Sequence, residues 1–255
     1  MSKPSWKYKR LVNQAIFSVR KYHTLVKFLV FILYILRLLA RKGEKPHKDI
    51  KNEKALSPKH GFMYVGNPKV ATRSVLQLLN EKCKDDLVIH HDTMSSLYDI
   101  DASYQNLYQF TLVRNPWARA YSCWKDKIST EKKFSDAFIL SKYKGLYPDM
   151  SFSEFVYWLN SEPGSDKYAD RHWLSQTELL ANEREKPIDL IGKIEDIEAF
   201  QQKLLEDTGL HFGSLKRLNN TSEGFHGYRK YYTEELRNLI AQRYKADIEA
   251  FDYQF

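Results

Sequence analysis

The feature that most constrains the fold is a nine-residue stretch, GNPKVATRS, at residues 66–74. It follows a short apolar run, residues 61–65, which predicts a buried strand, and it precedes apolar residues at helical spacing. A strand, a tight turn and a helix N-terminus form an anion site, because the first helical amides lack intrahelical partners. Lys69 adds a positive charge there, and Thr72 and Ser74 add hydroxyl donors. The stretch therefore predicts a phosphate-binding loop.

This loop differs from the common nucleotide-binding loop. The Walker pattern places its lysine after a second glycine and directly before Ser or Thr. Here Lys69 follows Pro68 and stands three residues before Thr72. An ordinary kinase or ATPase is therefore disfavoured, and a P-loop kinase-like phosphotransferase that uses ATP is kept as the alternative.

The order Pro-Lys-x-Ala-x-x-Ser after a first strand resembles the 5′-phosphosulfate loop of the sulfotransferases. Those enzymes use 3′-phosphoadenosine 5′-phosphosulfate (PAPS) as the sulfuryl donor. The resemblance implies that the donor is bound by Pro68, Lys69, Ala71, Thr72, Arg73 and Ser74.

A second motif, residues 112–122 (LVRNPWARAYS), is similar to the family's 3′-phosphate element. Residues 109–113 read as a strand, and Pro116 suits the first turn of the helix that follows. The resemblance implies that Arg114 and Ser122 bind the 3′-phosphate, and arginine offers the two-pronged donor that a phosphate prefers.

Further segments follow in the family's order, so the resemblance covers residues 60–255. These segments are similar to the carbohydrate-directed branch of the family (Golgi-type, heparan 2-O- and chondroitin-sulfotransferase-like). They are residues 170–176, 190–195, 218–222, 231–233 and 251–255. Within this branch, the chain resembles a single-domain, bacterial-type member. Two positions depart from the pattern: Arg73 stands where small hydroxyl residues are usual, and Asn115 replaces the more common aspartate.

The resemblance implies an α/β fold with a P-loop-like parallel sheet flanked by helices, and transfer of the sulfuryl group of PAPS to a hydroxyl, most simply of a glycan. Alternating strands and helices independently favour a parallel sheet covered on both faces. Lys69 suits the leaving oxygen, since in-line transfer depends on positioning and on stabilising developing charge. A non-catalytic protein of the same fold, bound to a membrane surface, is a further alternative.

A base must take the acceptor's hydroxyl proton, and histidine is suited to this near neutral pH. His90 and His91 end a short predicted strand, where the heparan 2-O-sulfotransferase-like enzymes carry their catalytic histidines. Because side chains alternate along a strand, one of the two should face the cleft. We favour His91, with His90 as the second choice, and interpret His172 as an acceptor-site or packing residue.

The positive charge of the chain is concentrated at its start. Residues 1–54 hold 14 Lys and Arg against 3 Asp and Glu, whereas the remaining residues hold 26 against 29. The predicted catalytic domain, residues 56–255, therefore offers no general basic face, and we expect no nucleic-acid partner. Residues 1–55 are expected to form a basic, partly apolar N-terminal segment and linker. The composition of residues 42–59 is typical of the linker, which leads into the domain.

Within residues 1–43, an apolar run at residues 25–39 is interrupted by Lys27 and Arg37. It is shorter than the roughly 20 apolar residues that a spanning helix needs. A basic amphipathic helix on an anionic membrane surface is favoured, with a short signal anchor or a helix packed on protein as alternatives. We therefore expect a cytoplasmic, membrane-associated protein, with a type II single-pass protein as the alternative.

The remaining patterns predict local structure. Cys83 and Cys123 are expected as free thiols in helices, and no residue set has metal-ligand spacing, so no metal is expected. Ser151 and Glu154 predict a capping box. A strand over residues 190–192, a helix over residues 197–208 and a long last helix from Thr233 to Phe251 complete the prediction, with a surface excursion at residues 125–149.

Overall fold

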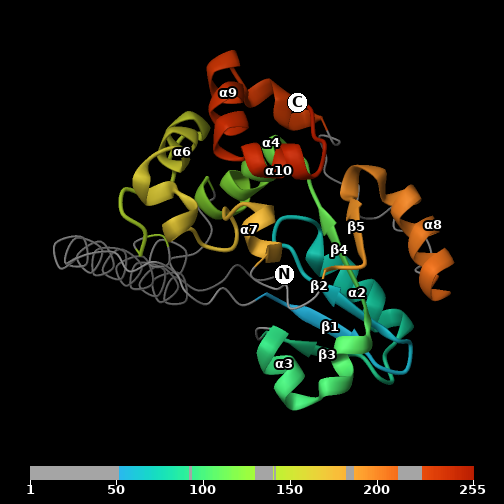
Figure 1. The fold of residues 1–255 in the computed structure, drawn as a ribbon. Helices are drawn as coiled ribbons and strands as arrows, with labels where there is room; N and C mark the ends of the chain where they lie inside the picture. Colours follow the sequence, from blue (N-terminus) through green and yellow to red (C-terminus); the bar gives the residue numbers. More distant parts are fainter. Residues whose placement is uncertain (1–51, 92–93, 130–139, 141, 182–186, 212–225) are drawn as a thin grey trace, which may run out of the picture.

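A computed structural model of the chain describes residues 52–91, 94–129, 140, 142–181, 187–211 and 226–255 (Figure 1). Its strands form one sheet in the order β3-β1-β2-β4-β5. Their bounds are β1 (Lys54–Ser57), β2 (Phe62–Val65), β3 (Val88–His90), β4 (Tyr108–Val113) and β5 (Leu190–Lys193).

The longer helices of the described residues are α2 (Thr72–Lys82), α3 (Met94–Ile100), α4 (Pro116–Cys123), α6 (Phe152–Leu159), α7 (Gln176–Ala181), α8 (Ile197–Thr208), α9 (Glu234–Arg243) and α10 (Lys245–Ala250). A π-helical turn, η2 (Trp124–Ile128), continues α4, and short 3-10 turns join other elements.

The predicted α/β class is confirmed, but the sheet is mixed rather than purely parallel. β2, β4 and β5 run parallel, whereas β1 lies antiparallel to β2 and to β3. The reason is the short connection from β1 to β2, in which Gly61 has a φ of 74° and donates its amide to the Pro58 carbonyl. Such a tight turn joins antiparallel neighbours, whereas parallel strands need a longer crossover.

Strand β1 lies within the predicted linker, residues 42–59, and corrects that prediction. Its charged first residue, Lys54, is fully buried, with Nζ 3.4 Å from the carbonyl of Asn52. A lysine beside a charged stretch weakens the apolar pattern by which buried strands are recognised. The domain therefore includes residues on both sides of the predicted boundary at 55/56.

Alternating side chains divide the core between the two faces of the sheet. In β2, Phe62 and Tyr64 pack with α2 and α8, whereas Met63 and Val65 join the larger cluster that includes α3, α4 and α6. The predicted coverage of both faces is confirmed. Gly192 of β5 permits the close approach of α8, because a Cβ there would lie 2.1 Å from a ring carbon of Phe200.

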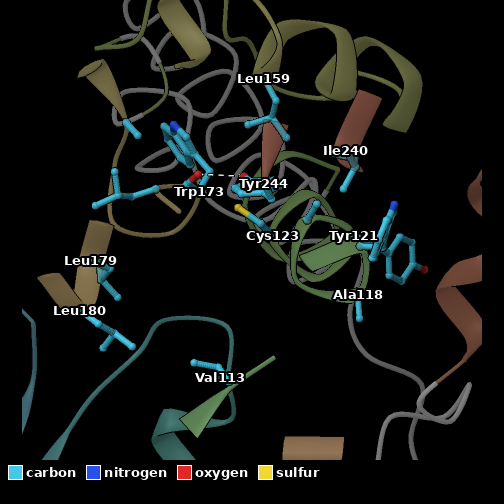
Figure 2. Close-up of a cluster of buried hydrophobic side chains, with 14 of the residues drawn as sticks. Val113, Ala118, Tyr121, Cys123, Leu159, Trp173, Leu179, Leu180, Ile240 and Tyr244 are labelled. Carbon is cyan, nitrogen blue, oxygen red and sulfur yellow. Dashed lines mark hydrogen bonds between the residues drawn. The ribbon is translucent and has the colours of Figure 1, made fainter. Parts of the chain in front are cut away.

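The larger cluster continues beyond the carboxyl end of β4, where α4, α6, α9 and α10 gather (Figure 1). Figure 2 shows Tyr121 and Cys123 of α4 among side chains from α6, α9 and the segment before α7. The Tyr244 hydroxyl donates to the Trp173 carbonyl at 2.8 Å. Trp117 and Trp173 are buried here, as core packing requires.

Several local predictions are confirmed. Ser151 and Glu154 form the capping box of α6, helix α8 has the predicted bounds, and Cys83 and Cys123 are free and buried. The predicted last helix breaks at Tyr244 into α9 and α10. Residues 125–149 are not simply a surface excursion, because four of the described side chains are buried there: Ile128, Leu140, Tyr143 and Leu146.

Residues 1–43, for which a membrane-surface helix was predicted, and the motif at residues 218–222 lie outside the described residues. In the part of the chain that is described, none of the helices combines the length and apolar character needed to cross a bilayer.

Candidate active site

The loop between β2 and α2 has the geometry of an anion site. Lys69 and Ala71 adopt left-handed backbone conformations, with φ of 71° and 50°. Such conformations cost energy in residues with a Cβ, and they cluster at ligand clamps. No side chain caps the first turn of α2 and no acidic residue lies in it. The positive end of the helix dipole therefore faces the loop without an acidic side chain in the first turn of α2 to neutralise it.

The loop is held in place by backbone and buried polar contacts. The Gly66 amide donates to the Glu53 carbonyl at 2.7 Å, and a Cβ at Gly66 would meet that same oxygen at 2.7 Å. The Thr72 hydroxyl donates to the Asn67 carbonyl at 2.5 Å. The hydroxyl proton of Thr72 thus stabilises the loop, which leaves the hydroxyl of Ser74 as the loop's other hydroxyl donor.

A cavity of about 450 Å³ opens beside this loop. All the donor-site residues predicted from sequence line it: Pro68, Lys69, Ala71, Thr72, Arg73, Ser74, Arg114 and Ser122. The two motifs, more than forty residues apart in sequence, therefore meet in one cavity. The remaining lining residues are Glu53, Asp126, Lys127, Arg171, His172 and Ile194.

Arg114 connects the two motifs through one hydrogen bond and has one buried N–H donor, Nε, without a partner in the described residues. Its Nη1 donates to the Lys69 carbonyl at 3.1 Å, whereas its buried Nε has no hydrogen-bond partner within the described residues. Burial lowers the pKa of Arg114, and the charge of Glu195 only partly opposes this. A buried cation with an unsatisfied donor in a cavity fits a phosphate, because leaving such a donor unpaired is costly.

Lys69 forms an ion pair with an acid beside the loop. Its Nζ lies 2.8 Å from Oδ2 of Asp126 in η2, and its side chain is 11% exposed. Burial lowers the pKa of Lys69, although the Cys123 thiol and Asp126 oppose that effect. An anionic ligand at the loop would take over the role of Asp126 as the counter-charge of this lysine.

His90 and His91 do not line the cavity. His90 ends β3 and pairs in register with Lys54, which in turn pairs with Val65 at the end of β2. The histidines thus lie at the end of the sheet where the strand before the loop also ends. They are two strands away from that strand, a separation of about 10 Å. The histidine that lines the cavity is His172.

His172 belongs to a hydrogen-bonded chain of three side chains. Its Nδ1 is in short contact with Oδ1 of Asp170, which also accepts the His172 amide at 3.0 Å. Oδ2 of Asp170 accepts the Tyr143 hydroxyl at 3.0 Å. Burial opposes ionisation of Asp170, but the hydrogen bonds and charge of His172 prevail and lower the pKa of Asp170 to about 2.

Two buried residues that the sequence analysis did not single out join the motifs together. Arg119 donates through Nε to the Pro68 carbonyl at 3.2 Å and through Nη1 to the Leu174 carbonyl at 2.7 Å. Oε1 of Gln176 accepts from Asn67 and from the Arg114 amide. Their signal was present, because both are long polar residues inside segments that carry the family's motifs.

The profile of the sulfotransferase family matches residues 53–254, nearly the whole described part of the chain. The chain belongs to the sulfotransferase family. Among curated proteins, this sulfotransferase-family chain is 26% identical to "Carbohydrate sulfotransferase 10" of Danio rerio, over 76% of the chain and 64% of that protein. The chain thus spans under two thirds of that relative's length, and no solved structure matches.

The family match confirms the fold class and the resemblance to carbohydrate-directed sulfotransferases. The donor that this family uses fits the residues present: an uncapped helix start and Lys69 for the phosphosulfate, and Arg114 with its unsatisfied Nε, beside Ser122, for a second phosphate. In the described residues, no group of three or more His, Cys, Asp or Glu could hold a metal ion.

Proposed function

We propose that the protein transfers the sulfuryl group of PAPS to a hydroxyl group of a carbohydrate. The observation that carries this proposal is the meeting of Lys69, Arg114 and Ser122 in one cavity beside an uncapped helix start. A donor with phosphate groups at both ends needs two separate anion sites, and the cavity offers both.

In this reaction the acceptor oxygen attacks sulfur in line with the bridging oxygen that departs with the phosphate. Negative charge develops on that bridging oxygen, and Lys69 stabilises it after leaving Asp126. Arg114 and Ser122 anchor the far end of the donor, which fixes the distance from sulfur to Lys69. Removal of the acceptor proton needs a base, for which the sequence suggested His91 or His90 and the cavity offers His172.

A carbohydrate acceptor is supported by the similarity to a carbohydrate sulfotransferase and by the polar, strongly charged lining of the cavity. Within the described residues, no structural feature specifically favours the alternative, an ATP-dependent phosphotransferase. The same holds for a protein without turnover, since the predicted donor-site residues all line the cavity.

Transfer from radiolabelled PAPS to desulfated heparan, to desulfated chondroitin and to N-acetyllactosamine oligosaccharides tests the proposal. We expect label on at least one glycan with the wild-type protein and none with Lys69→Ala. Label on glycans from radiolabelled ATP, with none from PAPS, would instead establish the kinase alternative. Tight binding of PAPS without transfer to any glycan would support the non-catalytic one.

The basic segment at residues 1–43 is proposed to bind an anionic membrane surface from the cytoplasmic side. Flotation of the full-length chain with phosphatidylserine-containing vesicles, compared with phosphatidylcholine alone, tests this. Binding that needs the anionic lipid and weakens with salt supports a surface helix. Resistance of the cellular protein to alkaline extraction would favour the type II anchor instead.

A further inference from the structure

The inference concerns the base of the proposed reaction, and it rests on the proposed function. Asp170, His172 and Tyr143 come from two segments that converge beside the cavity, and only His172 of the three lines it. The side chains of His172 and Asp170 are 23% and 26% exposed. Their arrangement places an imidazole in the cavity with a carboxylate behind it.

The hydrogen bonds determine which ring nitrogen can accept a proton. Asp170 is ionised at neutral pH, since its pKa is lowered to about 2, and an ionised carboxylate only accepts hydrogen bonds. Nδ1 of His172 must therefore carry the proton that it donates to Asp170. In the neutral ring Nε2 then holds the lone pair, as in other sites where a carboxylate selects the tautomer of a histidine.

His172 lines the same cavity as the lysine that the mechanism requires. The positive charge of Lys127 in η2, which also lines this cavity, acts on both Lys69 and His172. The lysine proposed for the leaving oxygen and the histidine therefore border one shared volume. By contrast, His90 and His91 lie two strands away and outside the cavity lining.

We infer that His172, rather than His91 or His90, is the general base of the reaction, with Asp170 and Tyr143 as positioning residues. The acceptor oxygen forms its bond to sulfur while its proton passes to Nε2 of His172. The bond from sulfur to the bridging oxygen breaks, and that electron pair remains on the phosphate of 3′,5′-adenosine bisphosphate beside Lys69. Asp170 stabilises the imidazolium that results, without taking up its proton.

The charges around His172 set the expected pH dependence. The groups that act on its ring are Asp170, Arg171 and Lys127, and the cavity adds Lys69, Arg73, Arg114, Glu53 and Asp126. Burial lowers the pKa of His172, against the opposing effect of Asp170. The neutral form that accepts a proton therefore prevails at pH 7, and the rate should fall as the pH drops below the usual histidine range.

The test compares His172→Asn, His90→Ala and His91→Ala in two assays. Asparagine can still donate an amide N–H to Asp170, so it removes the base and keeps the contact. The first assay is loss of label from radiolabelled PAPS in single turnover, with water and with desulfated heparan as acceptors, from pH 5 to pH 8. The second is calorimetric binding of 3′,5′-adenosine bisphosphate, which reports the donor site independently of the chemistry.

We expect His172→Asn to lower the rate about 100- to 10,000-fold and to abolish its fall at acid pH. Bisphosphate affinity should stay within about threefold, since the donor contacts proposed here come from the residue 68–74 loop, Arg114 and Ser122 rather than from His172. Tyr143→Phe should cost only a few-fold, and both His90→Ala and His91→Ala should keep the wild-type pH profile.

Two results would overturn the inference: a His172→Asn protein that keeps the wild-type rate and acid limb, or loss of turnover with intact bisphosphate binding in His90→Ala or His91→Ala. A wild-type protein that binds no bisphosphate and turns over no PAPS would be a different failure. It would refute the proposed function, and the base assignment with it.

Discussion

Among single residues, the pairing of Lys69 with Asp126 shows how the charge of the loop lysine is balanced within the protein. Burial opposes the ionisation of Asp126, yet Lys69 and Lys127 lower the pKa of Asp126 to about 2, so the ion pair persists at neutral pH. An incoming phosphate must displace this carboxylate from Lys69 and meets its negative charge. We therefore expect Asp126 to weaken binding of the proposed donor while it keeps Lys69 in place.

Asp126→Asn is predicted to tighten binding of 3′,5′-adenosine bisphosphate about fivefold, the equivalent of roughly 1 kcal/mol for a half-exposed pair. The matched control is Asp85→Asn, which breaks the exposed pair of Lys59 and Asp85, 2.6 Å apart and outside the cavity lining. Calorimetry should show no change in that control. Equal or weaker binding by Asp126→Asn would contradict the displacement argument.

Asp170 should make stability depend on pH. Burial raises its pKa, but His172 outweighs this and lowers the pKa to about 2, below the unfolded value of 3.8. A lowered carboxylate pKa stabilises the fold above the unfolded pKa and loses that effect as pH falls toward the folded pKa. Asp170→Asn should therefore cost about 2 kcal/mol at pH 7 and clearly less at pH 3, measured by urea unfolding. A cost that does not change with pH would contradict the assignment.

Among the elements, the start of α4 shows why asparagine suits position 115, where the family more commonly has aspartate. Oδ1 of Asn115 accepts from the first amides of α4, which aspartate could do equally well. Its Nδ2, however, donates to the Gln254 carbonyl at 2.7 Å and so ties the C-terminal residues to α4. Only the amide can serve both partners.

Asn115→Asp is accordingly predicted to destabilise the protein by about 1–3 kcal/mol, because a carboxylate would face the Gln254 carbonyl without a proton between them. Urea unfolding measures the loss. An aspartate variant as stable as the wild type would show that the C-terminal contact contributes nothing.

The elements also show what a sequence can predict. The β2 strand, the loop and α2 were predictable because their apolar spacing and their anion-binding chemistry agree. Strand β1 was missed because Lys54 hides its apolar pattern, and the break at Tyr244 was missed because the apolar face continues past it. Local patterns report periodicity, but not which strand pairs with which or where a helix must bend to close a core.

At the scale of the whole molecule, the site was predictable only in part. The residues predicted to bind the donor lie in two short motifs, which made them recognisable in the sequence, and the structure brings them together in one cavity. Asp126 and Asp170 were missed because their roles arise from contacts across more than one segment: Asp126 meets Lys69 across 57 residues, and Asp170 meets Tyr143 across 27. Such partners become visible only when the chain is folded.

Arg119 is the residue that most clearly acts on the whole molecule. Its guanidinium joins the phosphate loop to the segment that carries His172 through the carbonyls of Pro68, Leu174 and Arg171, and its side chain is almost fully buried. Lysine cannot reproduce this planar set of donors.

Arg119→Lys is predicted to lower the free energy of unfolding by roughly 3 kcal/mol, since buried carbonyls would lose their partners. It should also slow sulfuryl transfer. Arg237→Lys, a change at a partly exposed arginine of α9, is the control and should cost less than about 0.5 kcal/mol. Similar losses in both variants would show that Arg119 does not connect the two halves of the site.

We propose that two anion sites in one cavity bind the two ends of PAPS. Calorimetric titration of 3′,5′-adenosine bisphosphate into the wild type, Lys69→Ala and Arg114→Ala, with ATP as the comparison ligand, tests this proposal. We expect micromolar binding that ATP does not match, and we expect Arg114→Ala to weaken it tenfold or more, about 1.4 kcal/mol. Equal or tighter binding of ATP, or full affinity in Arg114→Ala, would contradict it.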